Sequence, residues 1–346
     1  MLIVLIMGGA IWGIGAMMKT PMQARIIMLA LLYVAVLFVQ FALPNGHPIR
    51  ENLGGGPGDW LVLGGAIALI LTYRKGLSAL KARARQDDPA PQQQGPFSDA
   101  ELERYARHIA LREVGGAGQR RLKDARVLVV GAGGLGSPAL LYLAGAGIGT
   151  IGLIDDDVVS LSNLQRQVIH TDERGGMPKV FSAEIAMRAL NPHITVRPYN
   201  RRFDNEIGAE ILQDYGLVLD GTDNFVTRQV VNAACVKAGV PLISGAITQW
   251  EGQLTLYDPA KGAPCLACVF PKPPAPGQSA TCAEAGVVGP LPGIIGTMMA
   301  LEAIKEITGA GETLGGSMIL YDGLTAETRR VKIKRNLNCP VCAGQI

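Results

Sequence analysis

Three apolar runs open the chain, and polar or basic positions separate them. They cover residues 1–18, 26–43 and 57–73. The first two have about the length that a helix needs to cross a bilayer. The apolar part of the third, residues 60–73, is only fourteen residues long, but a glycine-rich stretch before it can extend the helix. We expect three transmembrane helices in this part of the chain.

Basic residues predict how these helices are oriented. Lys19 and Arg25 lie between the first two runs, and a second basic stretch follows the third run. Basic loops stay in the cytoplasm. Three crossings place both basic stretches in the cytoplasm and residues 44–59 outside. Crossings by the first two runs alone would leave one basic stretch on the wrong side. We therefore expect residues 1–75 to be a multi-pass region of the inner (cytoplasmic) membrane, with the rest of the chain in the cytoplasm. The second stretch contains Arg74, Lys75, Lys81, Arg83 and Arg85.

A cleaved signal peptide is the alternative for residues 1–18. Signal peptides begin with a charged segment and end at a small-residue cleavage site. This run has neither, and further apolar runs follow it. We favour a retained helix.

A linker and a long α/β region follow. Residues 76–97 are first basic and then rich in Gln, Pro and Asp, without apolar periodicity, which is typical of a linker. From residue 98 onward, short apolar runs alternate with helical patterns. This alternation predicts an α/β domain over residues 98–346, with a Rossmann-like, doubly wound, largely parallel sheet and helices on both faces. The expected strands cover residues 126–130, 150–154, 195–199, 217–219 and 242–244, and the expected helices begin near residues 135, 179, 206 and 224.

Composition supports this division and excludes one class of function. Of the 346 residues, 48% are hydrophobic and 18% are charged, with a mean hydropathy of +0.24, which favours a part of the chain in lipid. Residues 1–97 carry eight basic and four acidic side chains, and the rest of the chain carries 24 and 25. Without a basic surface, nucleic-acid binding has no support.

A glycine-rich turn between a predicted strand and a predicted helix indicates a nucleotide site. Residues 131–136 read GAGGLG, with Gly131, Gly133 and Gly136 in the pattern GxGxxG. Such glycines permit a tight turn and a close approach of phosphate to the N-terminus of a helix. Asp155 stands at the end of the next predicted strand. A carboxylate there can accept hydrogen bonds from ribose hydroxyls.

Further charged residues indicate which nucleotide binds. Arg166 and Lys179, thirteen residues apart, suit a triphosphate, whereas nothing in the sequence indicates the hydride-transfer site of an NAD oxidoreductase. The alternative is that both are solvated surface charges. Asp223 follows another apolar strand and could hold a magnesium ion; Asp223 or Asn224 could instead cap a helix.

The motifs together resemble the MoeB/ThiF/HesA family, the prokaryotic relatives of ubiquitin-activating enzymes. They are GAGGLG, IDDDVVSLSNLQRQ, GMPKV, NPHI, LDGTDN, SGAITQWEGQLTLY and two distant CxxC pairs, in this order. The resemblance covers about residues 98–346 and is strongest to the molybdopterin-synthase adenylyltransferases. It implies the sheet of the ubiquitin-activating type and an enzyme that binds ATP and magnesium. It also implies adenylylation of the C-terminal Gly-Gly carboxylate of a ubiquitin-like sulfur carrier of the MoaD or ThiS type, with release of pyrophosphate.

The resemblance also implies roles for individual residues. Gly134 and Lys179 would contact the phosphates, Asp155 the ribose, and Asp223 the magnesium ion. Arg107 matches an arginine that is inserted into the neighbouring subunit's site, which implies a homodimer. The full nucleotide-binding set by this reading is Gly131, Gly133, Gly134, Gly136, Asp155, Ser162, Asn163, Leu164, Gln165, Arg166, Lys179, Asp223 and Asn224.

Four of the six cysteines form two pairs that suggest a metal site. Cys265 and Cys268 form the first pair, and Cys339 and Cys342 form the second, far along the chain. Two such pairs can close a tetrahedral four-thiolate zinc site, which is structural because no position stays open for water. A redox CxxC pair is the alternative, but the thioredoxin-like unit that it needs is missing.

Cys282 is the least certain of the candidate catalytic residues. Some members of the family carry a cysteine here that bonds covalently to the carrier, but adenylylation alone does not require it. Cys235 lies in a predicted helix and reads as a small buried hydrophobic residue. The four histidines, His47, His108, His170 and His193, read as surface or core residues.

Three functions fit the sequence. The first is activation of a sulfur carrier for molybdenum-cofactor or thiamine biosynthesis, and the second is ATP-dependent activation of a different carboxylate, for instance on modified tRNA. The third is a non-enzymatic membrane scaffold of the same fold. Only four residues follow Cys342, so a separate protein is expected to donate the sulfur.

Overall fold

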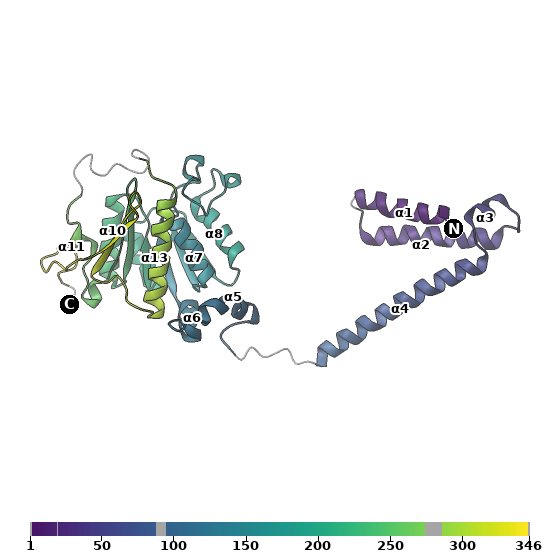
Figure 1. Cartoon of the computed structure of the whole chain (residues 1–346), viewed down its shortest axis with the longest axis horizontal. Helices are drawn as coiled ribbons and strands as arrows, with labels where there is room; N and C mark the ends of the chain where they lie inside the picture. The colour runs from purple at the N-terminus through teal and green to yellow at the C-terminus, as the bar shows by residue number, and fades with distance from the viewer. Residues whose placement is uncertain (1, 19, 88–94, 274–285, 345–346) are drawn as a thin grey trace. The chain divides into compact units, whose positions relative to one another are not determined.

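The computed structural model describes residues 2–18, 20–87, 95–273 and 286–344. The chain divides into an N-terminal unit, Met1–Gln94, and a C-terminal unit, Gly95–Ile346. Both units are coloured along the chain in Figure 1, and each is treated by itself.

In its described part the N-terminal unit consists of helices joined by short turns. Helices α1 and α2 run side by side as an antiparallel pair in Figure 1. Val4, Val36 and Trp60 form a small buried cluster among the helices. The turn between α1 and α2 is closed by Arg25, whose Nη2 donates to the carbonyl of Thr20 at 2.8 Å. The elements are α1 (Leu2–Met17), α2 (Met22–Ala42), α3 (Pro48–Leu53) and α4 (Pro57–Asp87).

Two helices in the described part are long and apolar enough to cross a membrane, rather than the three that we expected. They are Met22–Ala42 and Pro57–Ser78. The expected span over residues 1–18 is the one that falls short, because α1 has 16 residues. At 1.5 Å per residue it is about 24 Å long, whereas the hydrocarbon core of a bilayer is about 30 Å thick. The span expected over residues 57–73 falls within the second of these candidates, and its helix continues to Asp87, through the first part of the expected linker.

An eight-stranded mixed sheet forms the centre of the C-terminal unit. Its strand order is β3-β2-β1-β4-β5-β6-β7-β8. The first five are parallel, and the pairs from β5 to β8 are antiparallel. The strands are β1 (Arg126–Val130), β2 (Thr150–Ile154), β3 (Thr195–Tyr199), β4 (Leu217–Asp220), β5 (Leu242–Ile247), β6 (Glu251–Tyr257), β7 (Ser317–Asp322) and β8 (Glu327–Lys332).

The five parallel strands and the doubly wound arrangement confirm the expected fold class, but the antiparallel extension was not predicted. The strict alternation of strand and helix that revealed the other strands stops after β5, since β6 follows β5 and β8 follows β7 without a helix between them. Strand β8 is mostly exposed along its length and therefore lacks the apolar pattern of a buried strand.

Helices cover both faces of this sheet. Alternate residues of β1 point to opposite faces: Val127 and Val129 belong to one core and Leu128 and Val130 to the other. Figure 1 shows α13 and α7 side by side over the first core, with α8 beyond them. The helices are α5 (Asp99–Ile109), α6 (Gly115–Asp124), α7 (Gly136–Ala146), α8 (Lys179–Leu190), α9 (Asn205–Ile211), α10 (Phe225–Ala238), α11 (Leu266–Val269) and α13 (Pro290–Thr308).

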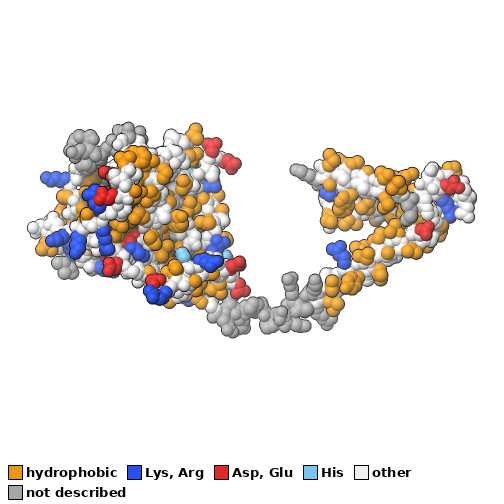
Figure 2. All heavy atoms as spheres, viewed as in Figure 1, with side chains coloured by type: hydrophobic (Ala, Val, Ile, Leu, Met, Phe, Trp, Pro, Cys, Tyr) orange, Lys and Arg blue, Asp and Glu red, His pale blue; other side chains and the backbone are white. Residues whose placement is uncertain are grey.

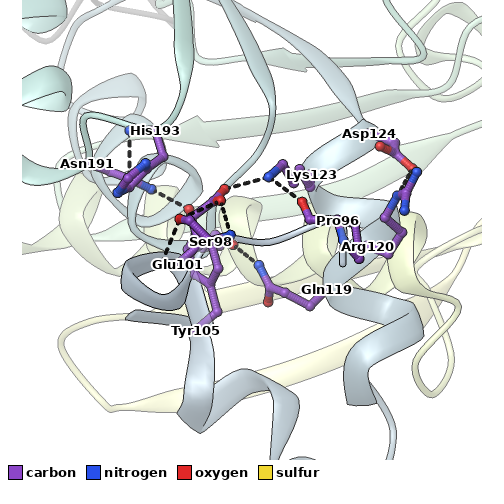
Figure 3. A network of polar contacts seen from close by, with 11 residues as sticks. Pro96, Ser98, Glu101, Tyr105, Gln119, Arg120, Lys123, Asp124, Asn191 and His193 are labelled. Carbon is purple, nitrogen blue, oxygen red and sulfur yellow. Dashed lines mark hydrogen bonds and ion pairs between the residues drawn. The ribbon is translucent and has the colours of Figure 1, made fainter. Parts of the chain in front are cut away.

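A partly buried polar network fixes the start of the C-terminal unit (Figure 3). Ser98 and Glu101 form a capping box at the N-terminus of α5. Lys123 at the end of α6 donates to Glu101 at 2.7 Å and to the carbonyl of Pro96 at 2.6 Å. Burial by itself raises the pKa of Glu101, but the hydrogen bonds from Lys123 and Ser98 outweigh it, and the pKa lies below its usual value. The first residues of the unit are thus tied to α5 and α6.

Candidate nucleotide-binding site

The glycine-rich turn joins β1 to α7 in a conformation that requires glycine. Gly131 has a φ of +95°, which side chains rarely adopt. A Cβ on Gly136 would collide with the carbonyl oxygen of Gly131. The turn therefore brings the first N–H groups of α7 to the carboxyl end of β1, where phosphate groups bind in folds of this class.

A cleft of about 670 Å³ opens beside this turn, at the carboxyl ends of the parallel strands. It brings together eight of the residues that the sequence suggested for the nucleotide. These are Gly131, Gly133, Gly134, Asp155, Arg166, Lys179, Asp223 and Asn224.

Asp155 lies at the end of β2 and holds the glycine-rich turn. One carboxylate oxygen accepts from the backbone N–H of Ala132 at 2.7 Å, and the other accepts from the N–H of Asp157 at 2.8 Å. Burial raises the pKa of Asp155, although nearby Lys179 and these hydrogen bonds oppose the rise. Each oxygen retains a lone pair, so the carboxylate can still accept a ribose hydroxyl.

The two cations that the sequence suggested lie on the wall of the cleft. Lys179 is buried at the start of α8, and its Nζ donates to Asp157 at 2.7 Å. The Nη2 of Arg166 donates to the Oδ1 of Asn163 at 2.7 Å. Both cations have further N–H donors that a phosphate oxygen could accept from, since an ammonium carries three and a guanidinium five.

The carboxyl end of β4 supplies acidic and polar side chains. Asp223 is exposed and lines the cleft, whereas Asn224 caps α10 by accepting from the N–H of Thr227 at 2.8 Å. The cap expected at one of these two positions is therefore Asn224. Asp220 is fully buried and accepts from the hydroxyl of Thr222 at 2.7 Å, so it supports the loop.

Several expected residues do not line the cleft. Gly136 acts through the tight turn, and Asn163 through its hydrogen bond to Arg166. Ser162 contacts Arg166 through its backbone carbonyl, at 3.4 Å. Neither Leu164 nor Gln165 is among the lining residues. Arg107 lies on an exposed part of α5 and is likewise absent from the cleft of its own chain.

The structure adds lining residues that sequence reasoning missed. Arg228 donates through Nη2 to the carbonyls of Thr222 and Gly245, the latter at 2.8 Å, and so joins the loop after β4 to β5. Its only sequence signal is its place one turn after the helix cap. The other missed cationic and amide side chains on the wall are Gln167, Arg201, Arg202, Gln253 and Lys272.

The four paired cysteines meet in one cluster next to α10 and α11. Their sulfur atoms all lie within 4.8 Å of one another. The Cys265–Cys268, Cys265–Cys339 and Cys268–Cys342 sulfur pairs are 3.8, 3.6 and 3.5 Å apart. A tetrahedral ion with zinc–sulfur bonds of about 2.3 Å places its ligands about 3.8 Å apart. The cluster therefore has the donor set and the spacing of a structural zinc site.

The remaining two cysteines have different outcomes. Cys235 is buried in α10, as expected, and burial raises the pKa of its thiol. Cys282 lies outside the described residues.

Comparison with known proteins identifies the family. The ThiF family matches residues 105–341. The chain is 48% identical over 253 residues to the sulfur carrier protein adenylyltransferase of Thermus thermophilus, covering 72% of this chain and 93% of that protein. It is also 48% identical over 250 residues to the molybdopterin-synthase adenylyltransferase of Salmonella typhimurium, covering 71% of this chain and 98% of that protein.

Solved structures agree with the fold. The crystal structure of PaaA has a TM-score of 0.61 at 24% identity and covers 77% of this chain and 83% of its own. Escherichia coli MccB in complex with MccA-N7isoASN also has a TM-score of 0.61, at 23% identity, over 72% of this chain and 76% of its own. This chain therefore belongs to the ThiF family, as its motifs indicated.

Proposed function

We propose that this chain uses ATP to adenylylate the C-terminal carboxylate of a ubiquitin-like sulfur carrier protein. The observation that carries the proposal is the cleft, in which the glycine-rich turn, Arg166, Lys179 and Asp223 converge at one edge of the sheet. Relatives that match almost over their whole length are named adenylyltransferases of sulfur carriers or of molybdopterin synthase. The enzyme is accordingly a nucleotidyltransferase.

The reaction joins two anions, and the cleft meets that requirement. A carboxylate oxygen of the carrier's last glycine bonds to the α-phosphorus of ATP, the bond to the bridging oxygen of the β-phosphate breaks, and pyrophosphate leaves. Arg166 and Lys179 offset the phosphate charge, and the N-terminus of α7 donates N–H groups to it. No general base is needed, because the attacking carboxylate is already ionised.

Asp223 would hold a magnesium ion. Mg²⁺ is usually held by one or two carboxylates together with substrate phosphates, rather than by protein ligands alone. Asp223 is an exposed carboxylate on the cleft wall and fits this preference. The ion would supply further neutralisation of the triphosphate.

A homodimer would complete the site through Arg107. Apolar side chains gather on the face of the C-terminal unit that α7, α8 and α13 form (Figure 2). They include Tyr142, Ile185 and Leu301, which are 58%, 47% and 57% exposed. A second copy that covers this face could place its Arg107 at the neighbouring cleft, as an arginine finger.

Helices α2 and α4 would anchor the enzyme in the membrane. Their apolar side chains are mostly exposed, which suits a lipid environment. Two crossings by these helices place Lys19, before α2, and the basic positions after Tyr73 on the same side, which is the cytoplasm by the distribution of Lys and Arg. The carrier, a separate sulfur donor and ATP would meet the C-terminal unit there, for molybdenum-cofactor or thiamine biosynthesis.

Pyrophosphate exchange tests the proposal. The detergent-purified chain is given ATP, labelled pyrophosphate and, in turn, each small protein of its own organism that ends in Gly-Gly. We expect exchange with one carrier and a loss of at least about 100-fold in Asp223→Asn, because electrostatic contacts to the reacting phosphates contribute on this scale. Asp124→Asn, which removes an exposed carboxylate on α6 that pairs with Arg120 and does not line the cleft, serves as the matched control.

Exchange with no carrier, despite measurable ATP binding, would contradict the proposal. ATP-dependent activation of another carboxylate, or a scaffold, would then be the better reading. Equal exchange by wild type and Asp223→Asn would remove Asp223 from the site.

A further inference from the structure

The peptide groups of Ala132 are held from two sides. Its N–H donates to Asp155 at 2.7 Å, and its carbonyl oxygen lies 3.0 Å from Nε2 of His170. His170 is buried, and its other ring nitrogen lies 2.9 Å from the hydroxyl of Ser182. The phosphate-binding turn is thus connected through one imidazole to helix α8.

The partners determine where the ring carries its proton. A carbonyl oxygen only accepts, so Nε2 of His170 is the donor to Ala132. In the neutral ring Nδ1 then accepts from Ser182, whose hydroxyl can donate. Burial lowers the pKa of His170; the hydrogen bond to Ala132 opposes this, but the nearby cations Lys179 and Arg174 add to the lowering. The neutral ring with the proton on Nε2 satisfies both contacts.

The connection joins the two elements that would contact ATP. Ser182 lies one turn after Lys179 on α8, and Ala132 lies within the glycine-rich turn. Arg174 also donates to the carbonyl of Ser182, at 2.8 Å, which fixes that turn of the helix. Movement of the turn relative to Lys179 would break a buried hydrogen bond of His170.

We infer that His170 is a positioning residue for ATP, which holds the glycine-rich turn in register with Lys179 through its Nε2–H. This inference rests on the proposed function, and it assigns a role to a histidine that the sequence alone marked as a surface or core residue. The role belongs to Nε2 rather than to the bulk of the ring. A histidine that only filled space in the core would not depend on which nitrogen is kept.

Two substitutions separate the two ring nitrogens. The amide nitrogen of Gln reaches about as far as Nε2 of histidine, so His170→Gln can keep the bond to Ala132. The shorter His170→Asn can keep the contact with Ser182 but not the one with Ala132. Exposed His193 supplies the matched control His193→Asn.

The measurement is the affinity of the full chain for ATP by equilibrium titration, together with the midpoint of thermal unfolding and pyrophosphate exchange. We expect His170→Asn to weaken ATP binding about tenfold, as for the loss of one buried hydrogen bond. His170→Gln should stay within about threefold of wild type, and His193→Asn should not differ from it. Ser182→Ala leaves the Ala132 bond in place but cuts the link from His170 to α8, so it should weaken ATP binding about threefold. If His170→Asn does not fold, an affinity of Ser182→Ala equal to that of wild type would contradict the inference.

Equal loss of ATP affinity in His170→Asn and His170→Gln would overturn the inference. It would also be overturned if His170→Asn unfolded at a lower temperature but kept the ATP affinity of wild type. In both cases wild type still binds ATP and exchanges pyrophosphate, so the proposed function stands. Failure of wild type itself to bind ATP overturns the proposed function and this inference with it.

Discussion

Gly136 shows how a single residue type shapes the nucleotide site. No ribose or phosphate needs to touch it, because its contribution is to let the chain pass close to Gly131. The sequence predicted the tight turn, but not the close approach of Gly136 to the Gly131 carbonyl. The same distinction applies to Asn163, which supports Arg166 from outside the cleft.

Substitution of Gly136 by alanine tests this account at the residue scale. The added methyl group collides with the Gly131 carbonyl, so Gly136→Ala should lower the free energy of unfolding by about 2 kcal/mol or more and weaken ATP binding. Gly293→Ala is the control, because this helical glycine has open space around its Cβ position. It should raise stability by about 0.5–1 kcal/mol. Thermal unfolding measures the stability of both variants, and ATP titration measures their affinity for ATP. Similar effects of the two substitutions would contradict the account.

Residues without a motif could not be predicted. Asp155, Arg166, Lys179 and Asp223 stand at recognisable positions, and the structure brings them to one cleft. Arg228 and His170 act through backbone carbonyls, which any donor of the right length could contact. Such contacts depend on the packed geometry and leave no spacing pattern.

At the scale of elements, the parallel half of the sheet was predictable and the antiparallel half was not. Strands β1, β2 and β4 are buried, so they read as continuous apolar runs. Strand β8 is an exposed edge strand, and its charged sequence is typical of edges that avoid aggregation. The uninterrupted apolar run at the start of the chain likewise predicted a longer helix than α1, which ends at Met17.

The capping box of α5 yields a pH-dependent prediction. Glu101→Gln removes the partner of Lys123 and should lower the free energy of unfolding at neutral pH by about 2 kcal/mol. The pKa of Glu101 in the folded chain lies below 4.5, its ordinary value, so its contribution is present above pH 4.5 and is lost as the pH falls through the folded-state pKa. The difference between wild type and variant should therefore shrink below pH 4.5.

Denaturant unfolding at several pH values checks this, with exposed Glu103→Gln on the same helix as control. A difference that stays constant down to pH 3, or one as large in the control, would show that the ion pair does not stabilise α5.

The cysteine cluster gives a second prediction at this scale. Zinc bound by the four thiolates would join the C-terminal residues to α11, so we expect one zinc per chain by elemental analysis. Cys342→Ser should lose most of the metal and unfold at a lower temperature, whereas Cys235→Ala, outside the cluster, should keep it. Purified wild type without zinc, or full retention in Cys342→Ser, would rule out this site.

For the whole molecule, the distribution of charge and apolar helices predicts the topology. A cysteine introduced at Asn45, between α2 and α4, should react in intact cells with a maleimide that cannot cross membranes. A cysteine at Leu80, beyond the candidate span Pro57–Ser78, should react only after the cells are opened. Equal labelling at both positions, or recovery of the chain in the soluble fraction, would contradict two crossings.

Trapping the activated carrier tests the central claim most directly. The chain, ATP and its Gly-Gly-ending carrier are incubated with hydroxylamine, which attacks an acyl adenylate, and the carrier is examined by mass spectrometry. The account predicts a hydroxamate on the C-terminal glycine that forms with wild type and ATP and disappears in Asp223→Asn. A carrier that stays unmodified at its C-terminus while the chain consumes ATP would contradict adenylylation.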